Sequence, residues 1–134
     1  MIVTTSREPS ARTRRVAKTL ARFLSLPYVN RGKQSLRDDE TWMLVVENHG
    51  NPQGFIKRTP EEEVVMNFTL SGEPKVKPMK KMVPVVQGIN EEAMPVARFF
   101  DLDTSERSAP RAIIAVLGSI EFVDEGVPIM RLKV

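Results

Sequence analysis

The spacing of hydrophobic residues changes along this chain, and the changes predict an alternation of strands and helices. Ile2 to Thr4 is a short β-branched run typical of a strand. Residues 10–25 then carry apolar side chains at helical spacing, which predicts a helix with one face on the core. Either Ser6 or Ser10 caps this helix, and Pro9 suits its first turn.

The predicted helix has one apolar face and one basic face. The apolar face consists of five residues: Val16, Ala17, Leu20, Phe23 and Leu24. Arg14, Lys18 and Arg22 recur at four-residue spacing on the opposite side, with Arg15 beside them. Like charges at this spacing repel by roughly 0.2–0.5 kcal/mol per pair. The row is therefore either an ordinary exposed face or a surface that binds an anion.

Beyond the helix, the pattern predicts short elements followed by a buried strand. Pro27 ends the helix, residues 28–30 favour a second short strand, and residues 31–33 favour a turn around a glycine. Ser35 opens a further helical turn. Trp42 to Val46 is a continuous apolar run, which predicts a strand covered on both faces.

The middle of the chain predicts a hairpin, a half-buried strand and a linker. Residues 49–54 are rich in turn formers, so Phe55 to Lys57 is expected to pair back on the preceding strand. Val64 to Leu70 alternates with a period of two, which is typical of a half-buried strand. Residues 71–82 hold prolines and lysines and are interpreted as a linker.

The last part of the chain predicts one more helix and several strands. In order, these are a brief strand over 83–86, a helix from a cap at Asn90 to about Phe100 with Pro95 in its first turn, a buried strand over 112–117, and a hairpin of 119–123 with 127–133 around a three-residue turn. With 134 residues, we expect a single α/β domain, residues 1–134. Its two related halves would be 1–70 and 83–134.

Composition narrows the class of protein. The chain has no cysteine, which excludes disulfides and thiolate chemistry. No apolar run approaches the ~20 residues that span a bilayer, and the first residues lack the layout of a signal peptide. We therefore expect a cytoplasmic protein without a membrane partner.

Positive charge is concentrated near the start of the chain. Residues 7–37 hold nine basic side chains: Arg7, Arg12, Arg14, Arg15, Lys18, Arg22, Arg31, Lys33 and Arg37. Glu8 is the only acid there, so this segment carries +8 while the whole chain carries +3, which leaves −5 for the rest. Such a segment is a candidate phosphate-binding surface, and we predict that these nine residues bind RNA.

Motifs of common enzymes are absent. The sequence has no P-loop, no dinucleotide-binding glycine motif and no H-E-x-x-H. The single histidine, His49, reads more readily as a turn residue than as a general base. Asp101, Asp103 and Glu106 lack the spacing of a calcium loop and favour a solvated helix end. We expect no enzyme activity, no metal and no cofactor.

The few aromatic residues beside the basic segment limit how it can recognise RNA. Tyr28 is the only tyrosine, and Phe23 belongs to the predicted core. A base-stacking platform is therefore not evident, and the surface is better suited to the RNA backbone and shape. Lys75 to Lys81 adds either a second basic patch or a mobile loop.

Several motifs resemble the Brix-domain family. They are Thr4 to Ser10 with Arg12-Thr13-Arg14, Val29 to Lys33 with Ser35-Leu36, the run Leu44 to Gly54, the strand Val64 to Leu70 and the closing hairpin Ser119 to Lys133. The linker and Val83 to Arg111 match only in outline. The chain is most similar to the compact archaeal members, which resemble the eukaryotic Brix protein of the small-subunit processome. The resemblance implies two similar α/β halves related to the anticodon-binding domain of class II tRNA synthetases.

The same resemblance implies a non-catalytic role in ribosome biogenesis, with precursor rRNA and ribosome assembly proteins as partners. The residues that match the family motif are Arg7, Arg12, Arg14, Asn30, Arg31, Gly32 and Lys33. Two alternatives stay open at this point. The basic surface could instead dock an acidic protein in a pre-ribosomal complex, or the chain could be an enzyme that acts on RNA.

Overall fold

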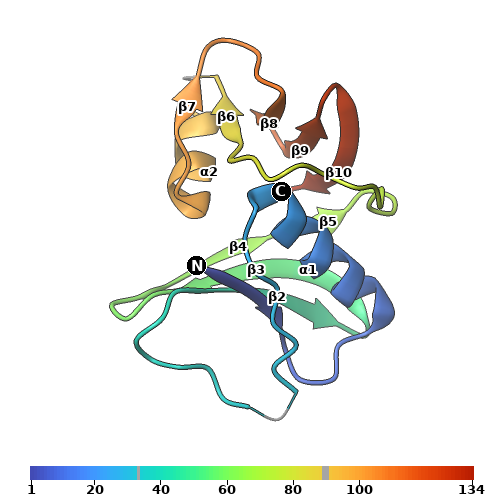
Figure 1. The fold of residues 1–134 in the computed structure, drawn as a ribbon, viewed down its shortest axis with the longest axis vertical. Coiled ribbons are helices and arrows are strands. Elements are labelled where there is room, and N and C mark those ends of the chain that lie inside the picture. The colour runs from blue at the N-terminus through green and yellow to red at the C-terminus, as the bar shows by residue number, and fades with distance from the viewer. Residues whose placement is uncertain (33, 89–90) are drawn as a thin grey trace.

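The computed structural model describes residues 1–32, 34–88 and 91–134. In this part of the chain the secondary structure comprises two helices and ten strands (Figure 1). The helices are α1 (Ala11–Leu24) and α2 (Ala93–Phe100). The strands are β1 (Ile2–Thr5), β2 (Trp42–Asn48), β3 (Asn51–Arg58), β4 (Glu63–Asn67), β5 (Thr69–Leu70), β6 (Val85–Gln87), β7 (Thr104–Ser105), β8 (Arg111–Val116), β9 (Ser119–Asp124) and β10 (Val127–Lys133).

The strands form two sheets. The first has the order β1-β2-β3-β4, in which β1 and β2 are parallel and the remaining pairs are antiparallel. The second has the order β5-β10-β9-β8-β6-β7. There β6 is parallel to both β7 and β8, and the β8-β9-β10 meander with β5 is antiparallel.

Both halves of the chain repeat one connectivity. In the first, β1 leads through α1 to the parallel strand β2, and β3 and β4 follow as antiparallel neighbours. In the second, β6 leads through α2 to the parallel strand β8, and β9 and β10 follow. This repeat confirms the predicted α/β fold of two similar halves. The exact boundaries at 70 and 83 stay a prediction, since β5 already pairs with β10 of the second sheet.

The structure corrects three predictions in the first half. Pro9 lies before the helix, because Ser10 is the N-cap and its hydroxyl oxygen accepts a hydrogen bond from the Thr13 amide at 3.1 Å. The predicted strand at 28–30 is reduced to an isolated bridge between Val3 and Tyr28. Residues 35–37 form no helical turn.

Two hairpin turns are shorter than predicted. The first is limited to His49 and Gly50, with φ of 51° and 79°, so β3 already begins at Asn51. The second consists of Glu125 and Gly126, with φ of 49° and 78°. Two positive φ values match the right-handed twist of the flanking strands and so permit a two-residue connection.

The segment predicted as one half-buried strand, 64–70, is divided between the two sheets. Its first part is β4, where Val64 and Val65 are 39% and 54% exposed. Phe68 is buried between the two strands, and β5 follows in the second sheet. The alternation in this segment therefore does not mark one strand with a buried face, because the segment crosses from the first sheet to the second.

The remaining elements agree with the sequence within a few residues. The predicted apolar faces of the first helix and of the strand at 42–46 are buried. The brief strand predicted at 83–86 is β6, and Pro95 lies in the first turn of α2. The short strand β7 was missed. The predicted cap Asn90 lies outside the described residues.

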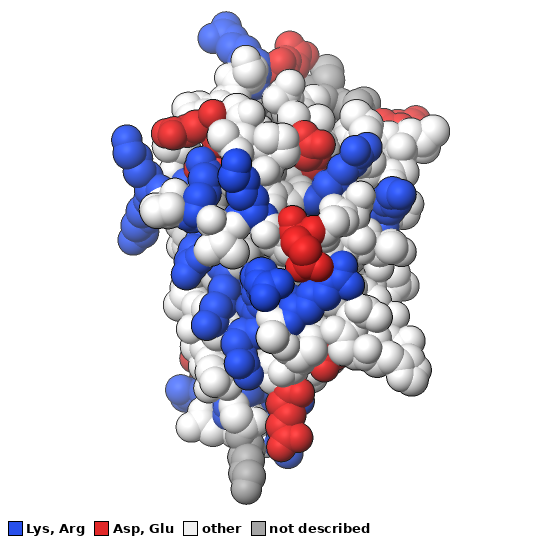
Figure 2. Space-filling model, turned by 90° about the vertical axis from the view of Figure 1, so that its right-hand side faces the viewer, with Lys and Arg blue, Asp and Glu red and all other residues white. Residues whose placement is uncertain are grey.

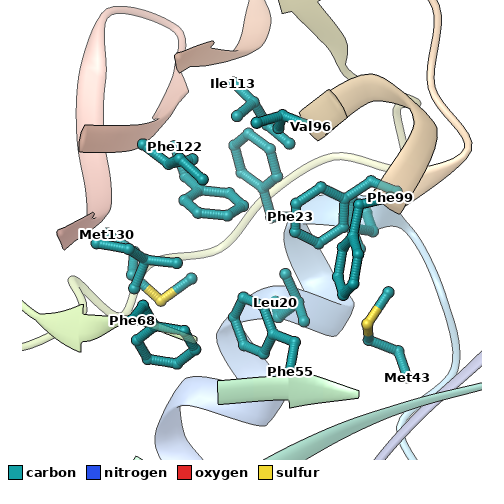
Figure 3. Packing of buried hydrophobic residues seen from close by; sticks show 14 of the residues in the cluster. Leu20, Phe23, Met43, Phe55, Phe68, Val96, Phe99, Ile113, Phe122 and Met130 are labelled. Carbon is teal, nitrogen blue, oxygen red and sulfur yellow. The ribbon is translucent and has the colours of Figure 1, made fainter. Parts of the chain in front are cut away.

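One hydrophobic core joins the two halves. Figure 3 shows Leu20 and Phe23 of α1 directed toward side chains of both sheets and of α2. Phe23 packs edge to face on Phe122 of β9, with ring centroids 5.2 Å apart, and Phe55 of β3 lies 6.0 Å from Phe100 of α2. Each fully buried aromatic side chain of this kind stabilises the fold by about 1.5–3 kcal/mol.

The linker 71–82 is irregular but fixed in place by a buried arginine. Arg111 is 2% exposed and donates hydrogen bonds to the carbonyls of Lys80 at 2.6 Å, Met82 at 2.8 Å and Phe23 at 3.2 Å. Its Nε lies 2.9 Å from Asp124 Oδ1. The end of α1, the linker and the β9–β10 hairpin therefore meet at one guanidinium.

Candidate nucleic-acid interface

Helix α1 presents the predicted basic row to solvent because eight of its fourteen residues are buried on the other side. Arg15, Lys18 and Arg22 are exposed, and Arg14 is half-buried beside them. The helix ends at Ser25, a left-handed residue with φ of 57° whose hydroxyl exchanges two 2.8 Å hydrogen bonds with the backbone of Met82. The linker therefore passes next to the last turn of the basic helix.

The basic row lines a shallow groove between α1 and the linker. The groove has a volume of about 250 Å³, and its walls include Arg14, Arg15, Lys18, Thr19, Arg22 and Val76. Figure 2 views the side of the molecule on which α1 lies in Figure 1, and shows Lys and Arg side chains gathered there in a band with acidic groups among them. The structure thus brings four of the nine predicted residues to one surface.

Within this groove the cations differ in their partners. Arg14, Lys18 and Arg22 form no ion pair within the described part of the chain. By contrast, Glu73 of the linker lies 2.9 Å from Arg12 Nε and 3.0 Å from Arg15 Nη1. One end of the groove is thus partly neutralised by a carboxylate that the sequence analysis did not connect with it. No pattern signals this pair, because the partners are some sixty residues apart.

A second hollow lies on the other side of the same row. It is lined by Lys18, Ala21, Arg22, Leu26 and Tyr28. The Lys18 ammonium lies 5.8 Å from the centre of the Tyr28 ring, within the range of a cation–π contact. The only tyrosine is therefore part of the basic surface, and Phe23 is fully buried, as predicted.

Arg7 and Arg31 lie at the end of β1, apart from the row on α1. The half-buried Arg31 donates from Nε to the carbonyl of Thr5 at 3.0 Å and from Nη1 to that of Gln34 at 3.3 Å. Burial, and then the like charge of Arg7, lower the pKa of the Arg31 guanidinium. It stays charged at neutral pH, since arginine does not lose its proton in proteins.

Arg37 does not line the groove. Arg37 is exposed and lies 3.6 Å from Asp39 and 3.9 Å from Glu40, so its charge is offset locally. Lys33 lies outside the described residues. Arg12, besides Glu73, donates to the side chain of Asn51 at 2.9 Å.

The N-terminus of α1 is occupied by a carboxylate of the chain itself. Glu47 of β2 accepts a hydrogen bond from the Ser10 amide at 3.1 Å and a short one from the Thr13 hydroxyl. Burial by itself raises the pKa of Glu47, but these hydrogen bonds outweigh it and lower the pKa overall. Glu47 thus takes the position at which a helix N-terminus would hold an outside anion.

His49 and Asp101, which the sequence favoured as a turn residue and part of a helix end, lie in such positions. His49 is an exposed turn residue. Asp101 follows the last turn of α2 and lies 2.7 Å from the Lys57 ammonium. Across residues 1–32, 34–88 and 91–134, no three His, Cys, Asp or Glu side chains come together in a way that would hold a metal ion. In the same ranges, neither helix is long and apolar enough to cross a membrane.

The relatives found by comparison with known proteins carry the same name. No family model matches the chain. A protein of Archaeoglobus fulgidus named "Probable Brix domain-containing ribosomal biogenesis protein" is 43% identical over 81 residues, which cover 57% of this chain and 53% of that protein. A Methanosarcina barkeri protein of the same name is 31% identical over 150 aligned residues, which cover 99% of this chain and 96% of that protein.

Solved structures show the same fold. The crystal structure of Mil, an archaeal Imp4-like protein, matches with a TM-score of 0.79 and 29% identity, over 99% of this chain and 95% of that one. A probable ribosomal biogenesis protein from Aeropyrum pernix K1 has the same fold, with a TM-score of 0.63 and 22% identity, over 98% of this chain and 92% of that one. Sequence motifs, duplicated topology and full-length relatives agree, and the chain belongs to the archaeal family of Brix domain-containing ribosomal biogenesis proteins.

Proposed function

We propose that this chain is a non-catalytic ribosome biogenesis factor that binds precursor rRNA and assists its processing and assembly. Its partners are ribosome assembly proteins in the cytoplasm. The observation that carries the proposal is the groove on α1, where Arg14, Lys18 and Arg22 share one wall and have no acidic partner in the described chain. The names of the relatives supply the ribosomal setting.

Phosphate is the group that fits this groove. Arginine binds phosphate through two parallel hydrogen bonds. The cations of this row recur every four residues, and the phosphates of an RNA backbone also recur at regular intervals. Like charges at this spacing repel one another, and a bound polyanion offsets this repulsion and releases its own counter-ions. Tyr28 lines the neighbouring hollow and is the only aromatic residue in the lining of either hollow, so the basic surface offers backbone contacts and at most one stacking position.

The salt dependence of RNA binding tests this assignment. Replacing Arg14, Lys18 and Arg22 together by Gln removes three phosphate contacts and keeps the side-chain stems. On an unstructured RNA of about 20 nucleotides, each contact contributes about 0.7 to the slope of log K against log salt. We expect the slope to become shallower by about 2 and the affinity at low salt to fall, as measured by fluorescence anisotropy.

A matched variant controls for total charge. Arg98, Arg107 and Lys133 are exposed cations of the second half, and none lines the α1 groove. Their replacement by Gln lowers the net charge equally and is expected to leave most of the slope intact. If both triple variants flatten the slope to the same degree, RNA is attracted by net charge alone and the α1 groove is not its site.

A further inference from the structure

Strand β4 leaves one side of its backbone open. It is the last strand of the first sheet and pairs only with β3. Among the described strands, the N–H and C=O groups on its outer side thus have no ladder partner, and Val64 and Val65 on this edge are 39% and 54% exposed. Natural proteins usually protect such an edge with charged residues or a covering segment, since it is a template for another strand.

An apolar groove lies beside this open edge. It has a volume of about 580 Å³, more than twice that of the α1 groove, and runs between β4 and α2. One wall is apolar and consists of Val64, Val65, Met66, Pro95 and Phe99. The rest of the lining is charged: Lys57 and Asp101, which lie 2.7 Å apart, Arg98, and Glu62 at the end next to the start of β4. In Figure 1 α2 lies to the left and α1 to the right, and this groove shares no lining residue with the α1 groove.

The groove leads into an acidic hollow at the start of β4. Glu62 lines both, and the hollow also includes Asp38, Glu61 and Glu63 around a single cation, Arg58. Arg58 is already paired, at 3.0 Å with Asp38 and at 3.8 Å with Glu63. Within the described chain Glu61 and Glu62 form no ion pair, so this end carries excess negative charge.

We propose that the β4 edge and its groove bind an extended segment of another protein, which adds to the sheet as a strand antiparallel to β4. Alternate apolar side chains of the segment fill the groove between β4 and α2. Lysine or arginine at its C-terminal end pairs with Glu61 and Glu62. Main-chain hydrogen bonds supply affinity and the side chains supply specificity, as in other cases of strand addition.

Charge decides between this occupant and the alternatives. An RNA would bring phosphate to the acidic end and be repelled. A second copy of this chain pairing through β4 would bring residues 61–70, which contain three glutamates and no lysine or arginine. The acidic end would then remain without a counter-charge. A basic, apolar segment of a different protein satisfies the groove, the open edge and the acids together.

Selection from a random peptide library tests the proposal. Displayed peptides of about ten residues, enough to pair along a five-residue strand, are selected on the full chain and counter-selected on Val65→Lys. A lysine in the middle of the edge blocks strand addition. We expect the retained peptides to alternate apolar and polar residues and to end in lysine or arginine.

Binding of one retained peptide is then measured on three proteins. We expect Val65→Lys to bind at least about tenfold more weakly than the native chain. Val116→Lys is the matched control, because Val116 is 53% exposed on β8 and lies outside the groove. It should bind as the native chain does, and amide shifts caused by the peptide should map to β4 and α2.

Three outcomes would overturn the proposal. The first is that the selected peptides are acidic, or that no peptide is enriched on the native chain over Val65→Lys. The second is a loss of binding by Val116→Lys as large as that by Val65→Lys, or amide shifts that map away from β4 and α2. The third is a dimer in sedimentation that Val65→Lys dissociates, which would assign the edge to a second copy. Since RNA binding is measured separately on the α1 groove, none of these results bears on the proposed function.

Discussion

At the scale of single residues, the ion pairs next to the linker are of two kinds, buried and partly exposed. Arg111 and Asp124 are 2% and 3% exposed and connect the linker to both halves. Glu73 and its partners Arg12 and Arg15 are partly exposed, with side chains 35–54% accessible. Removing one member of a buried pair leaves a charge in the interior, whereas an exposed pair contributes little to stability. The buried pair is therefore a structural contact, whereas the exposed pairs change the charge of the candidate binding surface.

The buried pair predicts a large loss of stability for Asp124→Asn. The amide leaves the Arg111 guanidinium without its counter-charge and weakens the contact with Lys77, which lies 2.9 Å from the same carboxylate. We expect the free energy of unfolding to fall by about 3–5 kcal/mol in urea titrations. Glu121→Gln on the same strand is the control and should cost less than about 1 kcal/mol. Equal losses would show that the pair has no special role.

The exposed pair predicts tighter RNA binding by Glu73→Gln. Loss of the carboxylate frees the guanidinium groups of Arg12 and Arg15 for phosphate. We expect the affinity for a single-stranded RNA to rise and the salt slope to steepen by up to about 1.4, or about 0.7 for each of two contacts. Glu106→Gln removes an exposed acid of the second half and should have a smaller effect. A slope unchanged by Glu73→Gln would show that RNA does not reach this end of α1.

At the scale of elements, α1 is held at both ends by groups from other parts of the chain. Its first turn is capped by Ser10 and by Glu47 from β2, and its last turn meets the linker through Ser25. A carboxylate at a helix N-terminus also interacts favourably with the helix dipole. The orientation of the basic row therefore depends on contacts distant in sequence and not on the helix alone.

The cap predicts a pH-dependent contribution from Glu47. Its folded pKa is lowered, so its stabilisation is present above the unfolded value of about 4.3 and is lost as pH falls through the folded pKa. We expect Glu47→Gln to lower the free energy of unfolding by about 1 kcal/mol near neutral pH. The difference from the native chain should shrink in urea titrations below about pH 4. A constant difference across this range would contradict the assignment.

Elements were predictable where the pattern is local. The apolar stripe of α1 and the continuous run of β2 identify those elements directly. The division of residues 64–70 between two sheets could not be predicted, because alternation is the same whether a strand stays in one sheet or crosses to the next. Turn length also failed at residues 49–54, where positive φ at His49 made a two-residue turn possible.

The candidate site was predictable only in part, for a related reason. Spacing on a helix correctly gathered Arg14, Lys18 and Arg22 on one face. Pairs that form across the fold leave no local signal, so neither Glu73 near Arg12 nor the burial of Arg111 was anticipated. The net charge of a segment gives the excess of its cations over its acids. It does not show which of these cations the folded chain pairs with an acid.

At the scale of the whole molecule, the two sheets share one core. Contacts such as Phe23 with Phe122 and Phe55 with Phe100 cross between the halves. Neither half buries its apolar side chains without the other, and the linker is fixed to both. A single domain over residues 1–134 stays a prediction, and the unfolding experiment below tests it.

The shared core predicts a single unfolding transition. Trp42, the only tryptophan, lies in β2 and reports on the first sheet, whereas far-ultraviolet circular dichroism reports on both. We expect the two signals to give the same midpoint in urea, within experimental error. Two separated midpoints would show that the halves unfold independently and would disprove the single-domain assignment.

The duplicated topology has a consequence for assembly. Helix α1 carries five basic residues, whereas its counterpart α2 carries only Arg98. The two halves share one connectivity but differ in their surfaces: one presents a row of cations, and the other borders a groove with an apolar wall and an acidic end. A domain of this length has a radius of gyration of roughly 14 Å, so a nucleic acid and a polypeptide held on the two sides stay within a few tens of ångströms. Such tethering raises the effective concentration of one for the other toward the millimolar range, and their encounter no longer depends on diffusion.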